Sequence, residues 1–184
     1  MQSDKERWNK RFKEKPFRDF VEPIVQKYAP MAKRGRALDI ACGQGRNTHH
    51  LLELGFEIDA LDLSDYALSQ VKDDPKIHKI EVDLDEYNLE KNKYDLVINI
   101  NYLNRRFFHQ IKEALKEGGI VIFETFIIAH GDFDNPQNPE YLLRRNELLH
   151  AFIGLDVIYY EERDDINLRG EKTRVASLVA QKRC

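Results

Sequence analysis

A short segment of the chain combines residue types whose backbone can hold a ligand. Gly43 and Gly45 follow an apolar run that begins at Ala37, and a helix is predicted directly behind them. Glycines in this pattern let the backbone come close to a ligand, and the free N–H groups at the start of the helix face the same place. The next apolar run, which begins at Ile58, ends on the acid Asp62. In parallel sheets ligands lie beyond the carboxyl ends of the strands, so the glycine turn and Asp62 are expected to serve one site.

Asp62 and the acid that follows the third predicted strand indicate the kind of ligand. A carboxylate at the end of a second strand can accept hydrogen bonds from both hydroxyls of a ribose, which predicts an adenosyl ligand. Asp83 and Leu84 would suit an adenine ring, the acid at its amino group and the leucine over its face. Thr48 stands where dinucleotide-binding folds need a small residue for close packing of helix on strand. This position counts against NAD.

Predicted strands and helices alternate along most of the chain. The strands are expected over 37–41, 58–62, 80–82, 94–100, 120–126, 155–161 and 175–181. Helices are expected over 8–12, 17–28, 48–54, 64–71, 107–115 and 141–153, with a long loop over 127–139. Alternation of this kind predicts a parallel sheet with right-handed crossovers, and the last two strands, which have no helix between them, should pair antiparallel. The fold class predicted is α/β: a doubly wound, mostly parallel, Rossmann-like sheet of seven strands with an antiparallel C-terminal hairpin at one edge.

Composition limits the classes of function. The 184 residues are 42% hydrophobic and 33% charged, with a net charge of −3, which fits one globular domain without a general attraction for nucleic acid or anionic membrane. The two cysteines, Cys42 and Cys184, form neither a zinc motif nor a disulfide framework, and no metal is expected. The N-terminus lacks an apolar signal segment, and the longest apolar run is too short to span a membrane. We therefore predict a cytoplasmic protein, a monomer or homodimer, with residues 1–34 as a helical lid segment and 35–184 as the α/β core.

The glycine turn is also familiar as a motif. The string Ala-Leu-Asp-Ile-Ala-Cys-Gly-Gln-Gly-Arg-Asn at 37–47 resembles motif I of the class I S-adenosylmethionine-dependent methyltransferases, and is closest to the small bacterial group that includes the tellurite-resistance methyltransferases. Further resemblances lie at 8–12, 115–120, 124–126, 138–139 and 141–148 and thus cover nearly the whole chain. The resemblance implies an S-adenosylmethionine-dependent methyltransferase of enzyme class EC 2.1.1, with S-adenosylhomocysteine as product.

The resemblance also implies roles for individual residues. The backbone of Gly43 and Gly45 would line the methionine part of the cofactor, and Asp62 would accept from the ribose. The other implied cofactor-binding residues are Asp39 and Cys42 in and beside the turn, Arg46 and Asn47 facing the carboxylate, Leu63, Asp83 and Leu84 around adenine, and Asn99 at the methionine amine. For Trp8, a lid on the cofactor with Arg11 and Phe12 and a helix-packing anchor are equal alternatives.

The methyl acceptor is less well defined by the sequence. After Asn99 the chain lacks the Asn-Pro-Pro-Tyr signature of DNA and amide-nitrogen methylation, and a single domain leaves only short elements to form a pocket, which favours a small-molecule acceptor. A general base is needed only if the acceptor arrives protonated, so the catalytic group is unknown. Tyr102, Glu124 and His130 are the positions where such a base would be sought, although each also has an ordinary structural explanation. Cys42 is interpreted as a small buried filler.

Three other functions stay open. An NAD-linked oxidoreductase would share the glycine turn and Asp62, and a non-catalytic S-adenosylmethionine-binding module would bind the cofactor without turnover. An RNA methyltransferase would need a local basic patch, for which the arginines available are Arg34, Arg36, Arg105 and Arg106.

Overall fold

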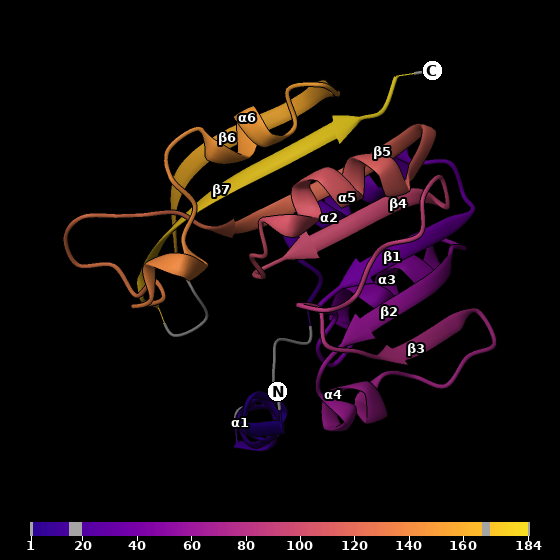
Figure 1. Cartoon of the computed structure of the whole chain (residues 1–184), viewed down its shortest axis with the longest axis horizontal. Helices are drawn as coiled ribbons and strands as arrows, with labels where there is room; N and C mark the ends of the chain where they lie inside the picture. The colour runs from indigo at the N-terminus through magenta and orange to yellow at the C-terminus, as the bar shows by residue number, and fades with distance from the viewer. Residues whose placement is uncertain (1, 15–19, 167–169, 184) are drawn as a thin grey trace.

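The computed structural model describes residues 2–14, 20–166 and 170–183. Within them, seven strands form one sheet (Figure 1). The strand order is β3-β2-β1-β4-β5-β7-β6, with the first five strands parallel and the last two antiparallel. The bounds are β1 Arg36–Ile40, β2 Glu57–Asp62, β3 Ile77–Glu81, β4 Tyr94–Ile100, β5 Leu115–Phe126, β6 Asp156–Ile166 and β7 Lys172–Gln181. This topology confirms the fold class predicted from the sequence.

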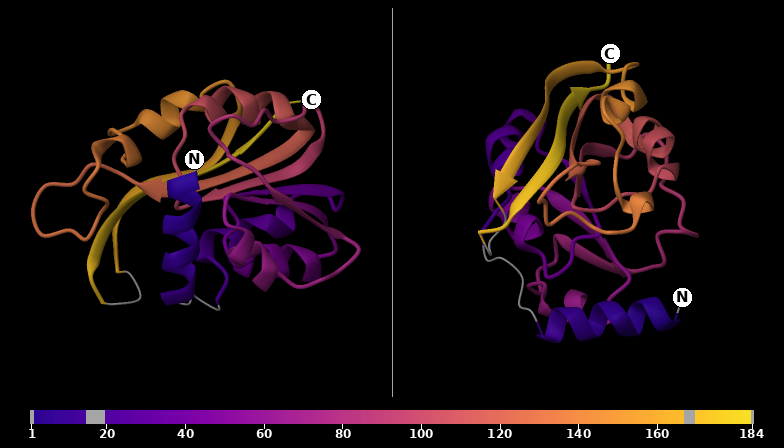
Figure 2. Two further views of the ribbon diagram at one scale, coloured as in Figure 1. Left: turned by 60° about the horizontal axis from the view of Figure 1, so that its bottom comes forward. Right: turned by 90° about the vertical axis from the view of Figure 1, so that its left-hand side faces the viewer.

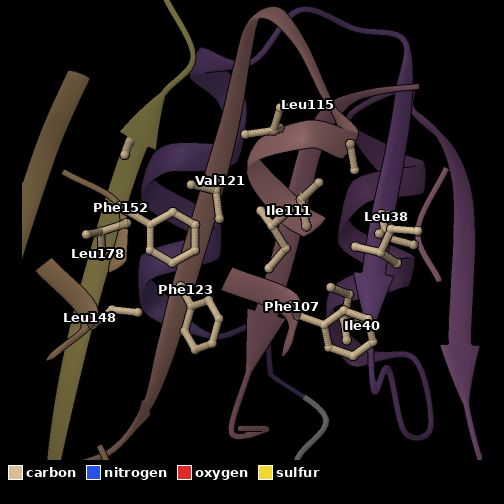
Figure 3. Close-up of a cluster of buried hydrophobic side chains, with 14 of the residues drawn as sticks. Leu38, Ile40, Phe107, Ile111, Leu115, Val121, Phe123, Leu148, Phe152 and Leu178 are labelled. Carbon is tan, nitrogen blue, oxygen red and sulfur yellow. The ribbon is translucent and has the colours of Figure 1, made fainter. Parts of the chain in front are cut away.

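Helices cover both faces of the sheet. Two apolar cores result, because the parallel strands carry buried side chains on both sides. One core packs α5 and α6 on the sheet through residues such as Phe107, Ile111, Phe123 and Phe152 (Figure 3), and the other packs α2, α3 and α4 on the opposite face. The helices are α1 Gln2–Glu14, α2 Pro23–Tyr28, α3 Arg46–Glu53, α4 Asp65–Gln70, α5 Arg106–Ala114 and α6 Glu147–Ala151, with short 3-10 turns at Ala29–Met31 and Pro139–Tyr141.

The prediction of a last helix over 141–153 is wrong for more than half of these residues, because α6 spans only Glu147–Ala151. Leu143 forms a parallel bridge with Ile127, which keeps the chain extended there, and Asn146 adopts a left-handed conformation with φ 60° before the helix begins. The backbone carbonyl of Leu142 accepts instead from the guanidinium of Arg105, at 2.9 Å. Tertiary contacts thus replaced helical hydrogen bonds that the apolar spacing had predicted.

Other boundaries moved by a few residues. The helix predicted over 17–28 begins at Pro23, a residue suited to the first helical turn, and its predicted residues 17–19 lie outside the described part of the chain. The third strand runs over Ile77–Glu81 instead of 80–82. β5 starts at Leu115, so Gly118 and Gly119 lie within this strand and do not precede it. The final two strands are each longer than predicted.

None of the helices among the described residues has the length and apolar character that a membrane crossing requires.

α1 lies outside the two helical layers, across the end of the molecule beside α4 (Figure 2).

Candidate functional site

The strand order reverses between β1 and β4, and the loops after these strands therefore diverge around an open edge. β1 pairs with β2 on one side and with β4 on the other, all three parallel. In open α/β sheets this is the point where ligands bind. The glycine turn follows β1, Asp62 ends β2, and Asn99 lies near the end of β4, so the sheet brings all three to one edge.

The turn after β1 holds an unusual backbone. Ala41, Gly43 and Gly45 have positive φ values of 56°, 56° and 84°. At Gly45, a Cβ atom would approach Val71 Cγ2 to 2.9 Å, so the turn is packed too closely for a side chain. Glycine is required here for both reasons, and the backbone stays open toward the edge of the sheet.

Asp62 is fixed by backbone donors on both of its oxygens. Its side chain is 7% exposed, Oδ2 accepts from the Gly43 N–H at 2.8 Å, and Oδ1 accepts from the Ser64 N–H at 2.9 Å. Burial raises the pKa of this carboxyl above its ordinary value. The acid predicted to bind ribose is therefore joined directly to the glycine turn, and each oxygen retains capacity for a further hydrogen bond.

Asp39 lies buried beneath the turn. Thr48 Oγ1 donates a hydrogen bond to its Oδ2 at 2.6 Å, and burial raises the pKa of Asp39 to about 7. This contact explains the threonine at a position where a dinucleotide fold needs a smaller residue. The hydroxyl is a partner for the buried acid, a role that sequence reasoning missed.

The two residues that open α3 face a segment before α2. Arg46 forms an ion pair of 2.5 Å with Glu22, and Asn47 Oδ1 accepts from the Glu22 backbone N–H at 3.0 Å. Glu22, which is 4% exposed, is a site residue that sequence reasoning did not identify, because no local pattern marked it. The proposed role of Arg46 and Asn47 toward a cofactor carboxylate stays a prediction.

Asn99 carries an unsatisfied buried group. Its Nδ2 donates to the Tyr102 carbonyl at 2.7 Å, while its Oδ1 is buried without a hydrogen-bond partner among the described residues. Such atoms are rare in folded proteins, and each calls for an explanation such as a bound water, an ion or a functional role. The sequence interpretation used only the backbone of Asn99, whereas the structure presents its side chain.

The residues predicted around adenine gather at the neighbouring part of the edge. Leu63 is half-buried after β2, and Leu84 is 5% exposed after β3. Asp83 precedes Leu84 and accepts from the Asp85 N–H at 3.0 Å, which shapes this loop. Their contacts with a ligand stay predictions.

α1 closes over this edge. Phe12, which is 5% exposed, lies against Gly43, and Trp8 packs on Phe12 with ring centroids 5.9 Å apart. Asn9 bonds both Ser64 and Asp65 at the start of α4, at 2.5 and 2.7 Å. This placement agrees with a lid, although the division of the chain at residues 34 and 35 stays a prediction.

The positions considered for catalysis differ sharply. His130 is exposed on the loop after β5, and Tyr102 is half-buried with a pKa that burial raises to about 12. Glu124 is 2% exposed, bonded to Ser177 and Arg163, and burial raises its pKa. Cys42 is buried, which raises the pKa of its thiol and leaves it a poor nucleophile.

The four arginines considered for a nucleic-acid patch do not form one. Arg36 begins β1 and is paired with Asp59 and Glu57, so it lies at the opposite edge of the sheet from the loop after β4. Arg105 is paired with Glu147, and Arg106 bonds the carbonyl of Leu84 at 3.2 Å. Arg34 bonds carbonyls of its own loop. The fold thus separates the two pairs of arginines that an RNA-binding patch would have needed.

Known proteins resemble the chain in the same region. Residues 37–119 match the sequence model of the family described as a methyltransferase domain. This match, together with the TehB proteins described next, shows a likeness to S-adenosylmethionine-dependent methyltransferases. The likeness agrees with the family predicted from the sequence.

Individual relatives agree with this assignment. The TehB protein of Haemophilus influenzae, named provisionally as an S-adenosyl-L-methionine-dependent methyltransferase, is 24% identical over 80% of this chain and 57% of its own length. Its crystal structure superposes with a TM-score of 0.75 at 20% identity, covering 96% of this chain and 67% of that one.

Two further relatives match shorter segments. YqeM of Bacillus subtilis, which carries a provisional methyltransferase name, is 31% identical over 53% of this chain and 44% of its own length. A tRNA U34 carboxymethyltransferase of Pseudoalteromonas atlantica is 28% identical over 56% of this chain and 36% of its own length. The chain thus spans about half the length of the curated relatives it matches.

Proposed function

We propose that this chain transfers a methyl group from S-adenosylmethionine to a small-molecule acceptor. The observation that carries the proposal is the buried carboxylate of Asp62, held by the N–H groups of Gly43 and Ser64 where the strand order reverses. A ribose diol donating to this carboxylate would lie directly over the glycine turn.

The structure offers a specific test of whether the cofactor fits. S-adenosylmethionine carries an ammonium group, and Asn99 offers a buried amide oxygen without a donor at the end of β4. A cationic donor placed there would satisfy that oxygen and gain a charge-assisted hydrogen bond. The residues present therefore fit the cofactor at its ribose, through Asp62, and at its amine, through Asn99.

The chemistry of the transfer asks little of the protein beyond alignment. The cofactor would supply a methyl group already activated on a sulfonium, which an acceptor would attack in line as S-adenosylhomocysteine leaves. Holding two reactants in the correct geometry can contribute roughly 7–11 kcal/mol. The rigid turn, Asp62 and Asn99 would fix the cofactor, while Phe12 on α1 covers Gly43 and excludes water from this side.

A small acceptor is favoured by how closely the edge is covered. α1 lies across it, and the Glu22–Arg46 pair joins the segment before α2 to the start of α3. A large polymer would have to displace both elements. The tRNA-modifying relative makes RNA the second acceptor to consider, but the four arginines that would form a patch are separated or paired in this chain.

Calorimetric titration of the purified chain with S-adenosylmethionine, S-adenosylhomocysteine and NAD tests the proposal. We expect micromolar binding of both adenosyl sulfur compounds and none of NAD. Binding of NAD alone would instead support hydride chemistry at the same turn. Binding of S-adenosylmethionine without turnover on any acceptor of a small-molecule panel would support the non-catalytic binding module.

A further inference from the structure

A cavity of about 170 Å³ opens between α2 and the strands β5 and β6. Lys27 and Tyr28 line it from α2, Glu124 from β5, and Tyr159 and Arg163 from β6. At roughly 30 Å³ per water molecule, the space corresponds to about six waters, which suits a ligand with one small ring. None of these five residues belongs to the cofactor site described above.

Glu124 forms the buried end of this cavity. Its Oε2 accepts hydrogen bonds from Ser177 and, at 3.1 Å, from Arg163, which also contacts Asp165 at 3.5 Å. The charges of Glu124 and Arg163 are therefore matched within the fold. Across the described residues, Glu124 Oε1 has no hydrogen-bond donor, so this oxygen is available to accept one from a ligand hydroxyl or N–H.

Lys27 and two tyrosine rings form the open end. The rings of Tyr28 and Tyr159 lie 5.4 Å apart at 30°, and the Lys27 ammonium lies 4.9 Å from the first centroid and 5.9 Å from the second. Lys27 is exposed, and no described carboxylate forms an ion pair with it. The mouth therefore presents a cation without a charged partner beside a flat aromatic wall.

The cavity adjoins the edge that carries the cofactor site. Glu124 pairs in register with Ile100 of β4, the residue after Asn99. On the other side, Glu22 directly precedes α2 and is paired with Arg46, the residue after Gly45. A ligand in the cavity would thus lie beside the turn predicted to hold the cofactor.

We propose that this cavity is the acceptor pocket and that it binds a small aromatic hydroxy acid. The ligand carboxylate would pair with Lys27, its ring would pack on Tyr28 and Tyr159, and its hydroxyl would donate to Glu124 Oε1. Its role as acceptor rests on the proposed methyl transfer, whereas the recognition chemistry rests on the cavity alone.

Calorimetry with para-hydroxybenzoate, benzoate and phenol as probes tests the recognition, with S-adenosylhomocysteine present throughout. We expect para-hydroxybenzoate to bind more tightly than benzoate, which lacks the hydroxyl, and than phenol, which lacks the carboxylate. Equal affinities for the three probes, or binding of para-hydroxybenzoate only when S-adenosylhomocysteine is left out, would overturn the proposal.

Variants assign each preference to a residue. Lys27→Met should reduce the preference for para-hydroxybenzoate over phenol by about threefold to fivefold, because an exposed ion pair is lost. Lys76→Met, on an exposed loop lysine outside the cavity, is the matched control and should leave the preference unchanged. Glu124→Gln should reduce the preference over benzoate by about tenfold, since a neutral amide replaces the charged acceptor.

Because Glu124 is buried, Glu124→Gln is the variant whose folding is most at risk. The Lys27 variant decides the proposal in that case, and an unchanged preference for para-hydroxybenzoate over phenol in Lys27→Met would contradict it. The proposed function is tested separately. S-adenosylhomocysteine that binds while no probe does would refute only the pocket, and probe binding without S-adenosylhomocysteine binding would refute only the methyl transfer.

Discussion

Asp59 and Asp62 lie on the same strand, β2, yet their surroundings are opposite. Asp59, 1% exposed near the beginning of the strand, is held by Arg36 at 2.6 Å, Tyr94 at 2.8 Å and Lys93 at 3.1 Å. Burial acts to raise its pKa, but these donors hold the pKa below its ordinary value. Asp62, at the end of the strand, meets only backbone N–H groups, and burial raises its pKa.

The difference separates a structural edge of the sheet from a binding edge. At the amino edge, the full positive charges of Arg36 on β1 and of Lys93 just before β4 match the buried carboxylate. At the carboxyl edge, Asp39 and Asp62 accept hydrogen bonds from neutral donors, and no group among the described residues donates to the amide oxygen of Asn99. Buried charges without matching charges cost stability, and such exceptions are expected where a ligand completes the arrangement.

The largest expected effect comes from Asp59→Ala. Removing this acid leaves Arg36 and Lys93 without their buried partner, so the free energy of unfolding should fall by about 3–5 kcal/mol in urea titrations. Asp73→Ala removes an ion pair with Lys79 at a fully exposed acid and should leave the free energy of unfolding nearly unchanged. An equal loss of unfolding free energy in Asp59→Ala and Asp73→Ala would contradict the structural role of the amino edge.

Asp62→Ala should act on binding. We expect S-adenosylhomocysteine affinity to fall at least tenfold by calorimetry, because a hydrogen bond to a charged group contributes about 1.5–3 kcal/mol. The affinity of the folded fraction of Asp59→Ala should remain that of the wild type. Unchanged affinity in Asp62→Ala would remove the ribose assignment.

Asp39 should give stability a pH dependence. Its pKa is about 7 in the folded chain because of burial, with Thr48 and Arg46 lowering it and Asp62 raising it, against 3.8 for the free group. The folded state therefore binds more protons between these values, and stability falls as pH rises through that range. Relative to Asp39→Asn, the wild type should lose about 2 kcal/mol from pH 5 to pH 8. A constant difference between the two urea curves would argue against the raised pKa.

Asn99→Leu should have the smallest effect. Removing the amide oxygen should weaken S-adenosylmethionine binding about threefold to tenfold, as for the loss of one hydrogen bond. Methylthioadenosine lacks the amine, so its affinity should not change and serves as the control. Equal losses for the two ligands would show that Asn99 acts through the shape of the site.

The sequence predicted much of the fold because its signals are local. Buried strands such as 94–100 are continuous apolar runs, and the glycine turn requires backbone angles that few residues adopt. It failed at 141–153, where the bridge from Leu143 to Ile127 and the bond from Arg105 override helical spacing. It also missed Glu22, whose partners Arg46 and Asn47 are distant in the chain.

The sequence by itself determined the class of sheet, the glycine turn and the set of residues expected at the cofactor, because these follow from periodicity, glycine conformation and strand ends. Only the tertiary structure decided which of the buried acids are matched by charge. Asp59 is reached by Arg36 from β1, by Tyr94 from β4 and by Lys93 from the turn before β4, and Thr48 reaches Asp39 from a helix. The pKa of a buried carboxyl depends on such distant donors, and their arrangement exists only once the chain has folded.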